Sequence, residues 1–259
     1  MTLEDEQVAR ESELARELLH APDKERRRNY GRAYDEIYAM HLARRGPSLE
    51  EKTFGASTSM LPLLTRLTAP GADVLEVGCG TGLLAIYLAR AGRRVTGADV
   101  SRVALAEAAR HADGHVRLVH LDGVALPFDT ESFDLVYTVE VLEHLHERDA
   151  EPHLRECFRV VRPGGALWLL TPNARFSGGA QERWSVAVEP DADVHLREWT
   201  YMELTRLLRS VGFRRLQSPL RHSGSLTPVG LSVLAERLPR HLATYANAVS
   251  VSIIGRKPL

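Results

Sequence analysis

Cysteine and long apolar runs are both scarce in this sequence, and each scarcity excludes a class of protein. The 259 residues include two cysteines, Cys79 and Cys157, which do not suggest a disulfide framework. We therefore predict a reducing, cytoplasmic environment. The acidic N-terminal segment has no apolar core and does not resemble a signal peptide. No apolar run approaches the length of a membrane span, so a membrane is not an expected partner.

A large net charge is also absent. The chain carries 33 Lys and Arg against 34 Asp and Glu, which gives a formal net charge of −1. Such a balance provides no strong attraction to nucleic acid, which is therefore not an expected partner. From Arg206 to the end, however, nine Lys or Arg residues accompany a single acidic residue, Glu236. An anionic substrate and a solubilising surface both explain this basic segment, and the second is the simpler explanation.

The most informative stretch that is present is a turn with three glycines in five residues, 78–82. It follows a short apolar run, 73–77, of the kind that forms a strand buried on both faces of a parallel sheet. A strongly helix-forming segment, 82–91, comes next. Glycines allow a sharp turn and the close approach of a ligand, and the start of a helix offers that ligand free N–H groups. Strand, glycine turn and helix together predict a nucleotide-binding βαβ unit.

Two carboxylates lie where successive strands are predicted to end. Asp99 follows the apolar segment 94–98 and is 21 residues beyond Gly78. At this place in a nucleotide-binding unit, an acidic side chain accepts hydrogen bonds from ribose hydroxyls. Asp122 follows a third strand, predicted over 115–119. Each carboxylate alone is also explained as the cap of a turn, but their joint position favours cofactor binding.

Strand and helix patterns alternate along the chain. Strands are predicted over 73–77, 94–98, 115–119, 133–138, 165–170, 213–220 and 247–255, and helices over 82–91, 102–110, 149–161 and 198–211. This alternation predicts an α/β fold with a doubly wound, mostly parallel, seven-stranded sheet. Residues 1–68 are expected to form a helical cap and 69–259 the domain that holds the sheet. In that domain we predict a lid loop over 171–198 and a helical insertion over 222–246.

Six segments, in this order along the chain, resemble those of one family. They read VLEVGCGTG, VTGADVS, LDGVALPF, SFDLVYTVEVLEHL, VVRPGGALWLLTPN and WTYMELTRLLRSVGF. Together they resemble the class I S-adenosylmethionine-dependent methyltransferases, in particular the group of the ubiquinone-biosynthesis methyltransferases. The resemblance covers 73–215. It implies a Rossmann-like methyltransferase fold, whose last two strands pair antiparallel at a sheet edge, and S-adenosylmethionine as the cofactor.

The resemblance also implies a role for each cofactor-binding residue. The backbone of the glycine turn approaches the methionine part, above Glu76, whose charge suits the ammonium group. Asp99 receives the ribose hydroxyls, Val100 packs on the adenine, and Asp122 accepts from the adenine amino group. The full set of expected cofactor-binding residues is Tyr30, Tyr34, Glu76, Gly78, Cys79, Gly80, Gly82, Asp99, Val100, Asp122, Gly123, Val124 and Val139.

The N-terminal part of the chain contains an aromatic stripe. Tyr30, Tyr34 and Tyr38 recur at helical spacing and share one face of a predicted helix. In the family that this chain resembles, an N-terminal helix often covers the cofactor cleft and offers a Tyr to it, which makes Tyr30 and Tyr34 candidates. Packing of the stripe on the core is an equally good interpretation. The basic cluster that precedes the stripe, 24–28, is predicted to be a solvated helix face.

A second group of candidate residues follows the fourth predicted strand and reads Glu-Val-Leu-Glu-His. In a helix, Glu140, Glu143 and His144 would share one face. The pattern Glu-x-x-Glu-His resembles the divalent-metal site of ubiquinone-type catechol O-methyltransferases and of the small-RNA 3′-terminal 2′-O-methyltransferases. The latter also have Thr-Pro-Asn and a later His-x-x-Glu-Trp-Thr, which this chain matches at 171–173 and 195–200.

The resemblance therefore implies a site for Mg²⁺ or a similar ion, with the ligands Glu140, Glu143, His144 and His195. The ion would hold the substrate and lower the pKa of its attacking hydroxyl. The catalytic candidates are Glu143, His144 and His195. A histidine that acts as an unassisted general base, or that only shapes the pocket, is the alternative. No RNA-binding module is recognised, so an RNA substrate is disfavoured.

The predicted activity is methyl transfer from S-adenosylmethionine to a small-molecule acceptor, and the chain is predicted to be an enzyme. A hydroxyl oxygen is favoured, with Mg²⁺ as a second cofactor. C- or N-methylation without a metal stays open, because the cofactor motifs are the same. The G-x-G-x-G spacing disfavours a nicotinamide dehydrogenase, and the intact glycines and ribose acid disfavour a catalytically silent methyltransferase-like subunit. The acceptor and the oligomeric state are left open.

Overall fold

One mixed sheet forms the centre of the molecule. The computed structural model describes residues 3–45, 60–175, 195–219, 226–235 and 250–259. The strands are β1 (Asp73–Val77), β2 (Arg94–Asp99), β3 (Val116–His120), β4 (Phe133–Val139), β5 (Val161–Pro172), β6 (Arg214–Pro219), β7 (Leu226–Pro228) and β8 (Ser250–Arg256). The helices are α1 (Leu3–His20), α2 (Asp23–Arg45), α4 (Leu83–Arg90), α5 (Arg102–His111), α6 (Glu147–Val160), α7 (Tyr201–Val211) and α8 (Val229–Ala235). Residues 60–67 are also helical.

The sheet has a parallel part and an antiparallel part. Its strand order is β3-β2-β1-β4-β5-β8-β6-β7. The first five strands in this order run parallel, and β8 is antiparallel to both β5 and β6. This arrangement confirms the doubly wound, mostly parallel α/β fold with antiparallel strands at one edge. It also places the carboxyl ends of β1 to β4 at the same end of the sheet, where ligands of such sheets bind.

The sheet has eight strands rather than seven, because the predicted helical insertion contains a strand. β7 pairs antiparallel with β6, and Thr227 Oγ1 donates a hydrogen bond to the carbonyl oxygen of Ser218 (3.1 Å). Pro228 has no N–H group and is tolerated because β7 lies at the outer edge of the sheet. The predicted helix is present as α8 among the described residues of the insertion, and 222–225 and 236–246 lie outside them.

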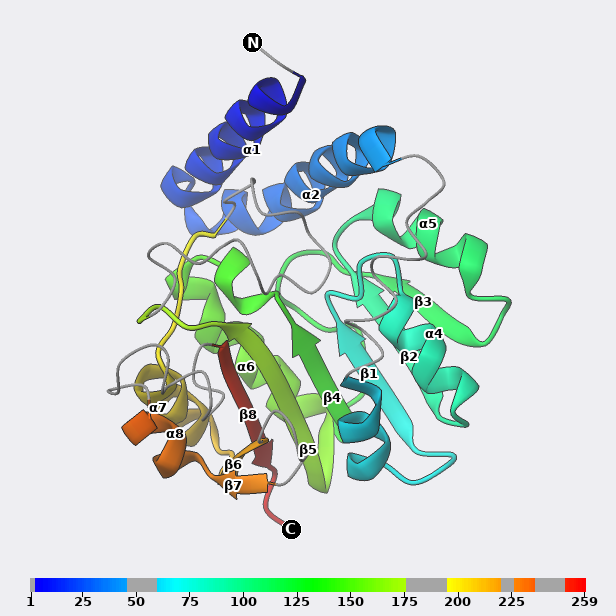
Figure 1. The fold of residues 1–259 in the computed structure, drawn as a ribbon, viewed down its shortest axis with the longest axis vertical. Coiled ribbons are helices and arrows are strands. Elements are labelled where there is room, and N and C mark those ends of the chain that lie inside the picture. Colours follow the sequence, from blue (N-terminus) through cyan, green and yellow to red (C-terminus); the bar gives the residue numbers. More distant parts are fainter. Residues whose placement is uncertain (1–2, 46–59, 176–194, 220–225, 236–249) are drawn as a thin grey trace.

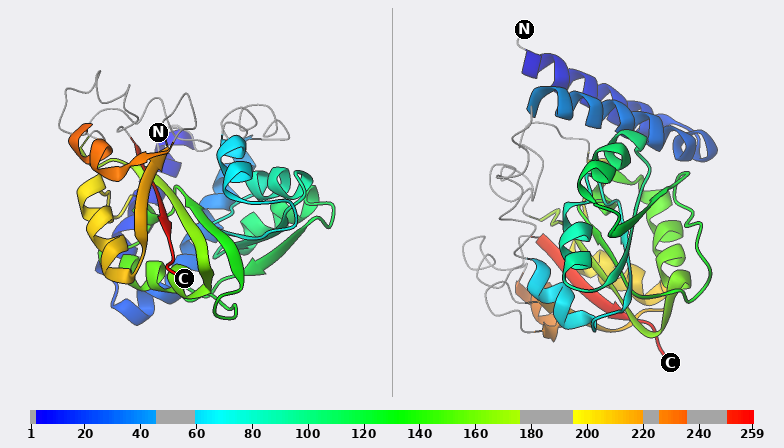
Figure 2. Two further views of the ribbon diagram at one scale, coloured as in Figure 1. Left: turned by 90° about the horizontal axis from the view of Figure 1, so that it is seen from below. Right: turned by 90° about the vertical axis from the view of Figure 1, so that its right-hand side faces the viewer.

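Different helices cover the two faces of the sheet. Leu75 and Val77 belong to one buried cluster, which also contains side chains of α6 and α7. Val74 and Tyr137 belong to the other cluster, together with side chains of α4. This separation follows from the alternation of side chains along a strand. Figure 2 shows α4 and α6 on opposite faces.

The N-terminal helices α1 and α2 lie across the end of the sheet to which the parallel strands point (Figure 1). The buried carboxylate of Asp149 attaches α2 to α6. It accepts hydrogen bonds from Arg26 Nε (2.7 Å), Arg27 Nε (2.7 Å) and the Tyr30 hydroxyl (3.0 Å). Burial opposes the charge of Asp149, but these hydrogen bonds hold its pKa below the usual range. Arg26 is only 1% exposed, so the predicted solvated face over 24–28 is wrong at this residue.

A second carboxylate attaches α2 to α5. Asp35 Oδ1 accepts hydrogen bonds from the Ser101 hydroxyl (2.8 Å) and from the N–H of Val103 (3.1 Å). The free N–H groups at the start of a helix favour an anion, so Asp35 is well placed there. Together, Asp35 and Asp149 hold α2 over the strand ends.

Two other expectations concern segments that are described only in part. Of the predicted lid loop, 171–172 belong to β5, and 176–194 lie outside the described residues. The boundary between a cap over 1–68 and a domain over 69–259 stays a prediction. None of the described helices has the length and apolar composition that a membrane span requires.

Candidate active site

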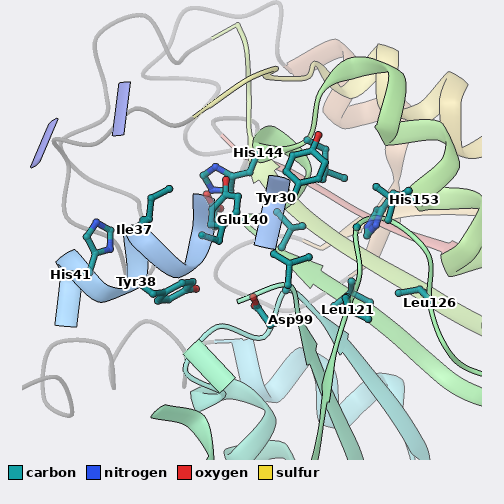
Figure 3. A pocket seen from close by; sticks show the side chains of 18 of the residues that line it. Tyr30, Ile37, Tyr38, His41, Asp99, Leu121, Leu126, Glu140, His144 and His153 are labelled. Carbon is teal, nitrogen blue, oxygen red and sulfur yellow. The ribbon is translucent and has the colours of Figure 1, made fainter. Parts of the chain in front are cut away.

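A cavity lies between α2 and the carboxyl ends of β1 to β4 (Figure 3). The space between its lining atoms is about 1070 Å³, the open mouth included. Seven of the expected cofactor-binding residues line it, namely Tyr30, Tyr34, Gly78, Asp99, Val100, Gly123 and Val124.

The glycine turn brings backbone atoms to the wall of this cavity. Gly78 has a φ of 75°, and its N–H donates a hydrogen bond to the carbonyl oxygen of Ala98 (2.7 Å), which ties the end of β1 to β2. A Cβ atom at Gly78 would overlap Val141, and a Cβ atom at Gly80 would lie 2.5 Å from the Tyr38 hydroxyl. Both glycines also have a positive φ, so a larger residue would be strained at either position.

Asp99 lines the cavity at the end of β2. Its Oδ2 accepts a hydrogen bond from the N–H of Gly80 (2.7 Å), and its Oδ1 accepts one from the N–H of Ser101 (2.8 Å). Burial raises the pKa of Asp99, although these backbone hydrogen bonds favour its charge. A carboxylate has lone pairs for further donors, so Asp99 retains the capacity to accept from ribose hydroxyls.

Six expected residues do not reach the cavity wall, namely Glu76, Cys79, Gly80, Gly82, Asp122 and Val139. Glu76 and Val139 lie on the face of the sheet that carries Tyr137, whereas Val77 faces the cavity. Glu76 Oε2 accepts a hydrogen bond from the Tyr137 hydroxyl (2.9 Å), and burial raises the pKa of Glu76 to about 8. Asp122 is exposed. The roles of these six residues toward the cofactor stay predictions.

The three tyrosines of α2 have different surroundings. The Tyr30 hydroxyl is used in the contact with Asp149 and also accepts from the N–H of His146 (2.9 Å). The Tyr34 hydroxyl is buried without a hydrogen-bond partner in the described part of the chain, and the Tyr34 ring meets the His144 ring edge to face at 5.7 Å. Tyr38, which was not among the candidates, lines the cavity above the glycine turn. The stripe therefore both packs on the core and lines the cavity.

Three expected metal ligands lie together beyond the end of β4. One ligand atom from each of Glu143, His144 and His195 lies within 4.8 Å of the others. Glu143 is fully buried, and its Oε2 accepts from the Thr171 hydroxyl (2.9 Å). Its Oε1 has no hydrogen-bond partner among the described residues. A buried, unpartnered carboxylate oxygen next to two imidazoles fits a divalent cation.

Glu140 is not one of the three residues whose ligand atoms lie within 4.8 Å of one another, although its carboxyl group interacts with that of Glu143. Its φ is 53°, and it is followed by a single 3₁₀ turn, Leu142–His144, so the expected helical face is wrong. The reason is that the N–H of Glu140 still bonds to the carbonyl oxygen of Leu170 in β5 (2.9 Å), which keeps the chain in the sheet up to this point. Burial, and then the nearby Glu143 carboxylate, raise the pKa of Glu140 well above its usual value. Glu140 lines the cavity.

Sequence reasoning missed three further polar side chains that line the cavity: Glu11, His41 and His153. Burial lowers the pKa of His153 to about 4, so this imidazole is neutral at pH 7. The sequence contains one signal for Glu11, because it falls at helical spacing between the apolar residues Val8 and Leu14. An acidic residue within an apolar stripe indicates a buried carboxylate with a specific partner or ligand.

Comparison with known proteins identifies the family. Residues 74–165 match the model of a methyltransferase domain. A "probable S-adenosylmethionine-dependent methyltransferase" of Mycobacterium tuberculosis is 33% identical over 195 residues, which cover 70% of this chain and 68% of that protein.

Two further relatives are matched over shorter lengths. A "probable S-adenosylmethionine-dependent methyltransferase" of Mycolicibacterium smegmatis is 39% identical over 145 residues, 55% of this chain and 52% of that protein. The ubiquinone biosynthesis O-methyltransferase of Coxiella burnetii is 35% identical over 114 residues, 43% of this chain and 48% of that protein. The chain thus spans about half the length of these two relatives.

Solved structures support the same fold. The PH0226 protein of Pyrococcus horikoshii has a TM-score of 0.60 at 17% identity, and the aligned part covers 84% of this chain and 98% of the PH0226 chain. The [4+2]-cyclase SpnF has a TM-score of 0.53 at 25% identity and covers 77% of this chain and 80% of its own. Sequence motifs, sheet topology and relatives agree, and the chain belongs to the S-adenosylmethionine-dependent methyltransferases.

Proposed function

We propose that this chain transfers the methyl group of S-adenosylmethionine to a hydroxyl oxygen of a small molecule. The observation that carries the proposal is the position of His144, which belongs both to the group with Glu143 and His195 and to the wall of the cavity. Methyl transfer to a hydroxyl requires a base that removes the hydroxyl proton close to the bound cofactor, and this cavity offers both. The similarity to a ubiquinone biosynthesis O-methyltransferase supports oxygen as the acceptor atom.

The cavity offers each part of the cofactor a suitable surface. Asp99 accepts from the ribose hydroxyls, and the apolar side chains of Val100 and Val124 pack against the adenine. The backbone at Gly78 allows the methionine part to approach closely. The residue types and their shared position on the cavity wall support these roles.

The chain itself has to hold, align and deprotonate the acceptor. S-adenosylmethionine supplies the methyl group on a sulfonium centre, so no nucleophilic side chain is needed. His144 takes up the hydroxyl proton, and its ring lies 5.2 Å from that of His195. His195 Nδ1 is in turn 2.9 Å from Glu198 Oε1, which orients the second imidazole. Alignment of the acceptor oxygen with the methyl group supplies the rest of the rate enhancement.

In an alternative form of the same reaction, Glu143, His144 and His195 would bind a divalent cation, and His144 would then not be the base, because its free nitrogen lone pair would be held by the ion. The ion would lower the pKa of the attacking hydroxyl, so that less basic strength is needed from the protein. Two imidazole ligands favour a metal such as Zn²⁺ or Fe²⁺ over Mg²⁺, which prefers oxygen ligands. The metal part of the proposal is therefore a transition-metal site rather than the expected Mg²⁺ site.

Calorimetric titration with S-adenosylhomocysteine tests the proposal. Saturable binding is expected, and Asp99→Ala abolishes it. Titration of the saturated protein with Zn²⁺ gives a further heat that is lost in Glu143→Ala. Full activity after exhaustive chelation would contradict the metal site, and absence of S-adenosylhomocysteine binding would contradict the cofactor site.

The similarity to the [4+2]-cyclase SpnF supports a second candidate, a reaction without methyl transfer in the same cavity. The formation of S-adenosylhomocysteine distinguishes the two. Methyl transfer releases one equivalent for each product molecule, whereas the second candidate converts its substrate without consuming S-adenosylmethionine.

A further inference from the structure

The N-terminal helices contribute a polar pair to the cavity. Glu11 of α1 is fully buried, and its Oε1 lies 2.9 Å from His41 Nε2 of α2 and accepts from Gln7 Nε2 (2.7 Å). Its other oxygen, Oε2, is buried and has no hydrogen-bond partner among the described residues. Both Glu11 and His41 line the cavity. A buried carboxylate oxygen that lacks a donor is costly, and a donor on a bound ligand removes that cost.

The charges around the cavity restrict what this ligand is. Three carboxyl groups line it, those of Glu11, Asp99 and Glu140, and no Lys or Arg does so among the described residues. The raised pKa of Glu140 favours its neutral form, so the negative charge comes mainly from Glu11 and Asp99. An anionic ligand would meet repulsion there without a compensating cation. A cation, in contrast, would be attracted and would form a charge-assisted hydrogen bond with the free oxygen of Glu11.

The pair lies away from the candidate adenine site. Figure 3 shows Ile37, Tyr38 and His41 together on α2 at one end of the cavity, and Leu121 and Leu126 at the other end. The side chains between Glu11 and the opposite end are mostly apolar or aromatic. A ligand that reaches the pair therefore has an apolar body with a cationic group at its end.

We propose that Glu11, oriented by His41, binds a protonated amine of the methyl acceptor. The acceptor is thus an amine-bearing molecule with an apolar body, whose ammonium group donates to Glu11 Oε2. This inference rests on the proposed function, because it assigns the amine to the acceptor of that reaction. It also disfavours the anionic substrate that the basic segment after Arg206 suggests, since none of the described Lys or Arg residues of that segment lines the cavity.

Three probes with the same apolar body and different charges test the proposal. Binding of phenethylamine, 2-phenylethanol and 3-phenylpropionate is measured by calorimetry, with and without saturating S-adenosylhomocysteine. The amine binds about tenfold more tightly than the alcohol, as one charge-assisted hydrogen bond predicts, and the acid binds most weakly. Glu11→Gln keeps the shape of the side chain and removes this preference, while the affinity for S-adenosylhomocysteine is unchanged.

Two further variants control the experiment. Glu13→Gln makes the same change on α1 at a side chain that is 56% exposed, and it keeps the preference for the amine. His41→Asn removes the imidazole that orients the Glu11 carboxylate and is expected to weaken the preference for the amine, so it provides a test if Glu11→Gln does not fold.

Three outcomes overturn the inference: equal binding of the three probes, tighter binding of the acid, or no binding of any probe in the millimolar range. A Glu11→Gln variant that loses affinity for S-adenosylhomocysteine also overturns it, because the carboxylate would then serve the cofactor. Absence of S-adenosylhomocysteine binding in the unmodified protein contradicts the proposed function instead. In that case, the binding of the three probes measured without S-adenosylhomocysteine still tests the preference of Glu11 for the amine.

Discussion

Asp99 connects two strand ends and the glycine turn through one carboxylate. Its two oxygens accept from the N–H groups of Gly80 and Ser101, and an amide side chain can satisfy only one of them as an acceptor. Asp99→Asn is therefore expected to weaken S-adenosylhomocysteine binding by about tenfold or more and to lower the free energy of unfolding by about 1–2 kcal/mol. Calorimetry and urea unfolding measure the two effects. An unchanged affinity would remove Asp99 from the cofactor site.

Glu76 gives a prediction for the pH dependence of stability. Burial raises its pKa from 4.5 to about 8 in the folded protein. Between these values the folded state binds one more proton than the unfolded state, so the stabilisation present below pH 4.5 is lost as the pH rises toward 8. We expect the free energy of unfolding to fall by roughly 3–5 kcal/mol across this window.

The matched variant for this prediction is Glu76→Gln, which has no proton to exchange and keeps an acceptor for the Tyr137 hydroxyl. Urea unfolding at pH 5 and pH 8 is compared in the two proteins, so that the contributions of other groups cancel. A fall of the same size in Glu76→Gln would show that another group causes it.

Residues in short local patterns were the predictable ones. Gly78 and Asp99 could be found because their roles depend on neighbours in the sequence and on the end of a strand. Arg26 could not, since its burial depends on the packing of α2 against α6, which is distant in the sequence. The partner of Glu11, which is His41 of α2, could not be predicted for a similar reason. The exposed Asp122 shows the reverse: its position after a strand was predicted, but the direction of its side chain was not.

At the scale of elements, the attachment of α2 to α6 depends on one buried charge. Asp149 is fully buried and bonds to Arg26, which is 1% exposed. Asp149→Ala removes the buried partner of this guanidinium and leaves it the half-exposed carboxylate of Asp23, so we expect a loss of about 3–5 kcal/mol in the free energy of unfolding. Faster amide hydrogen exchange is expected in α2, because α2 loses a contact that holds it over the strand ends.

The control for this change is Glu151→Ala on the same helix. Glu151 forms an exposed ion pair with Arg155, and such pairs contribute little to stability. Equal losses in the two variants would show that the buried pair has no special role in holding α2.

Elements with strong periodicity were also predicted well. β1, the glycine turn and α4 have a clear pattern and are present where it indicated them. β7 was missed because three residues that end in proline carry no strand pattern and gain their structure only by pairing with β6. The spacing of the polar residues at 140, 143 and 144 allows a helix, which was therefore expected. The hydrogen bond of Glu140 to β5 instead keeps the chain in the sheet up to this point, and only a single 3₁₀ turn follows at 142–144.

For the whole molecule, cofactor specificity gives a direct test. A ligand that binds only the folded state stabilises it by about 2.7 kcal/mol at 100 times its Kd. For a chain of this size we expect S-adenosylhomocysteine at that concentration to raise the Tm by roughly 5–10 °C. NAD⁺ at the same concentration leaves the Tm unchanged, because the turn has the G-x-G-x-G spacing. Stabilisation by NAD⁺ would instead favour a dehydrogenase.

The cytoplasmic location stays a prediction.

The position of β8 has a consequence for how the chain reaches its final form in the cell. β8 is the last of the strands in the sequence, but it lies between β5 and β6 in the sheet. The ribosome therefore releases β1 to β7 before residues 250–256 become available. Until then, β5 and β6 each present an unpaired edge to other chains. Nascent chains that stop before this point should be the ones that chaperones retain and proteases remove.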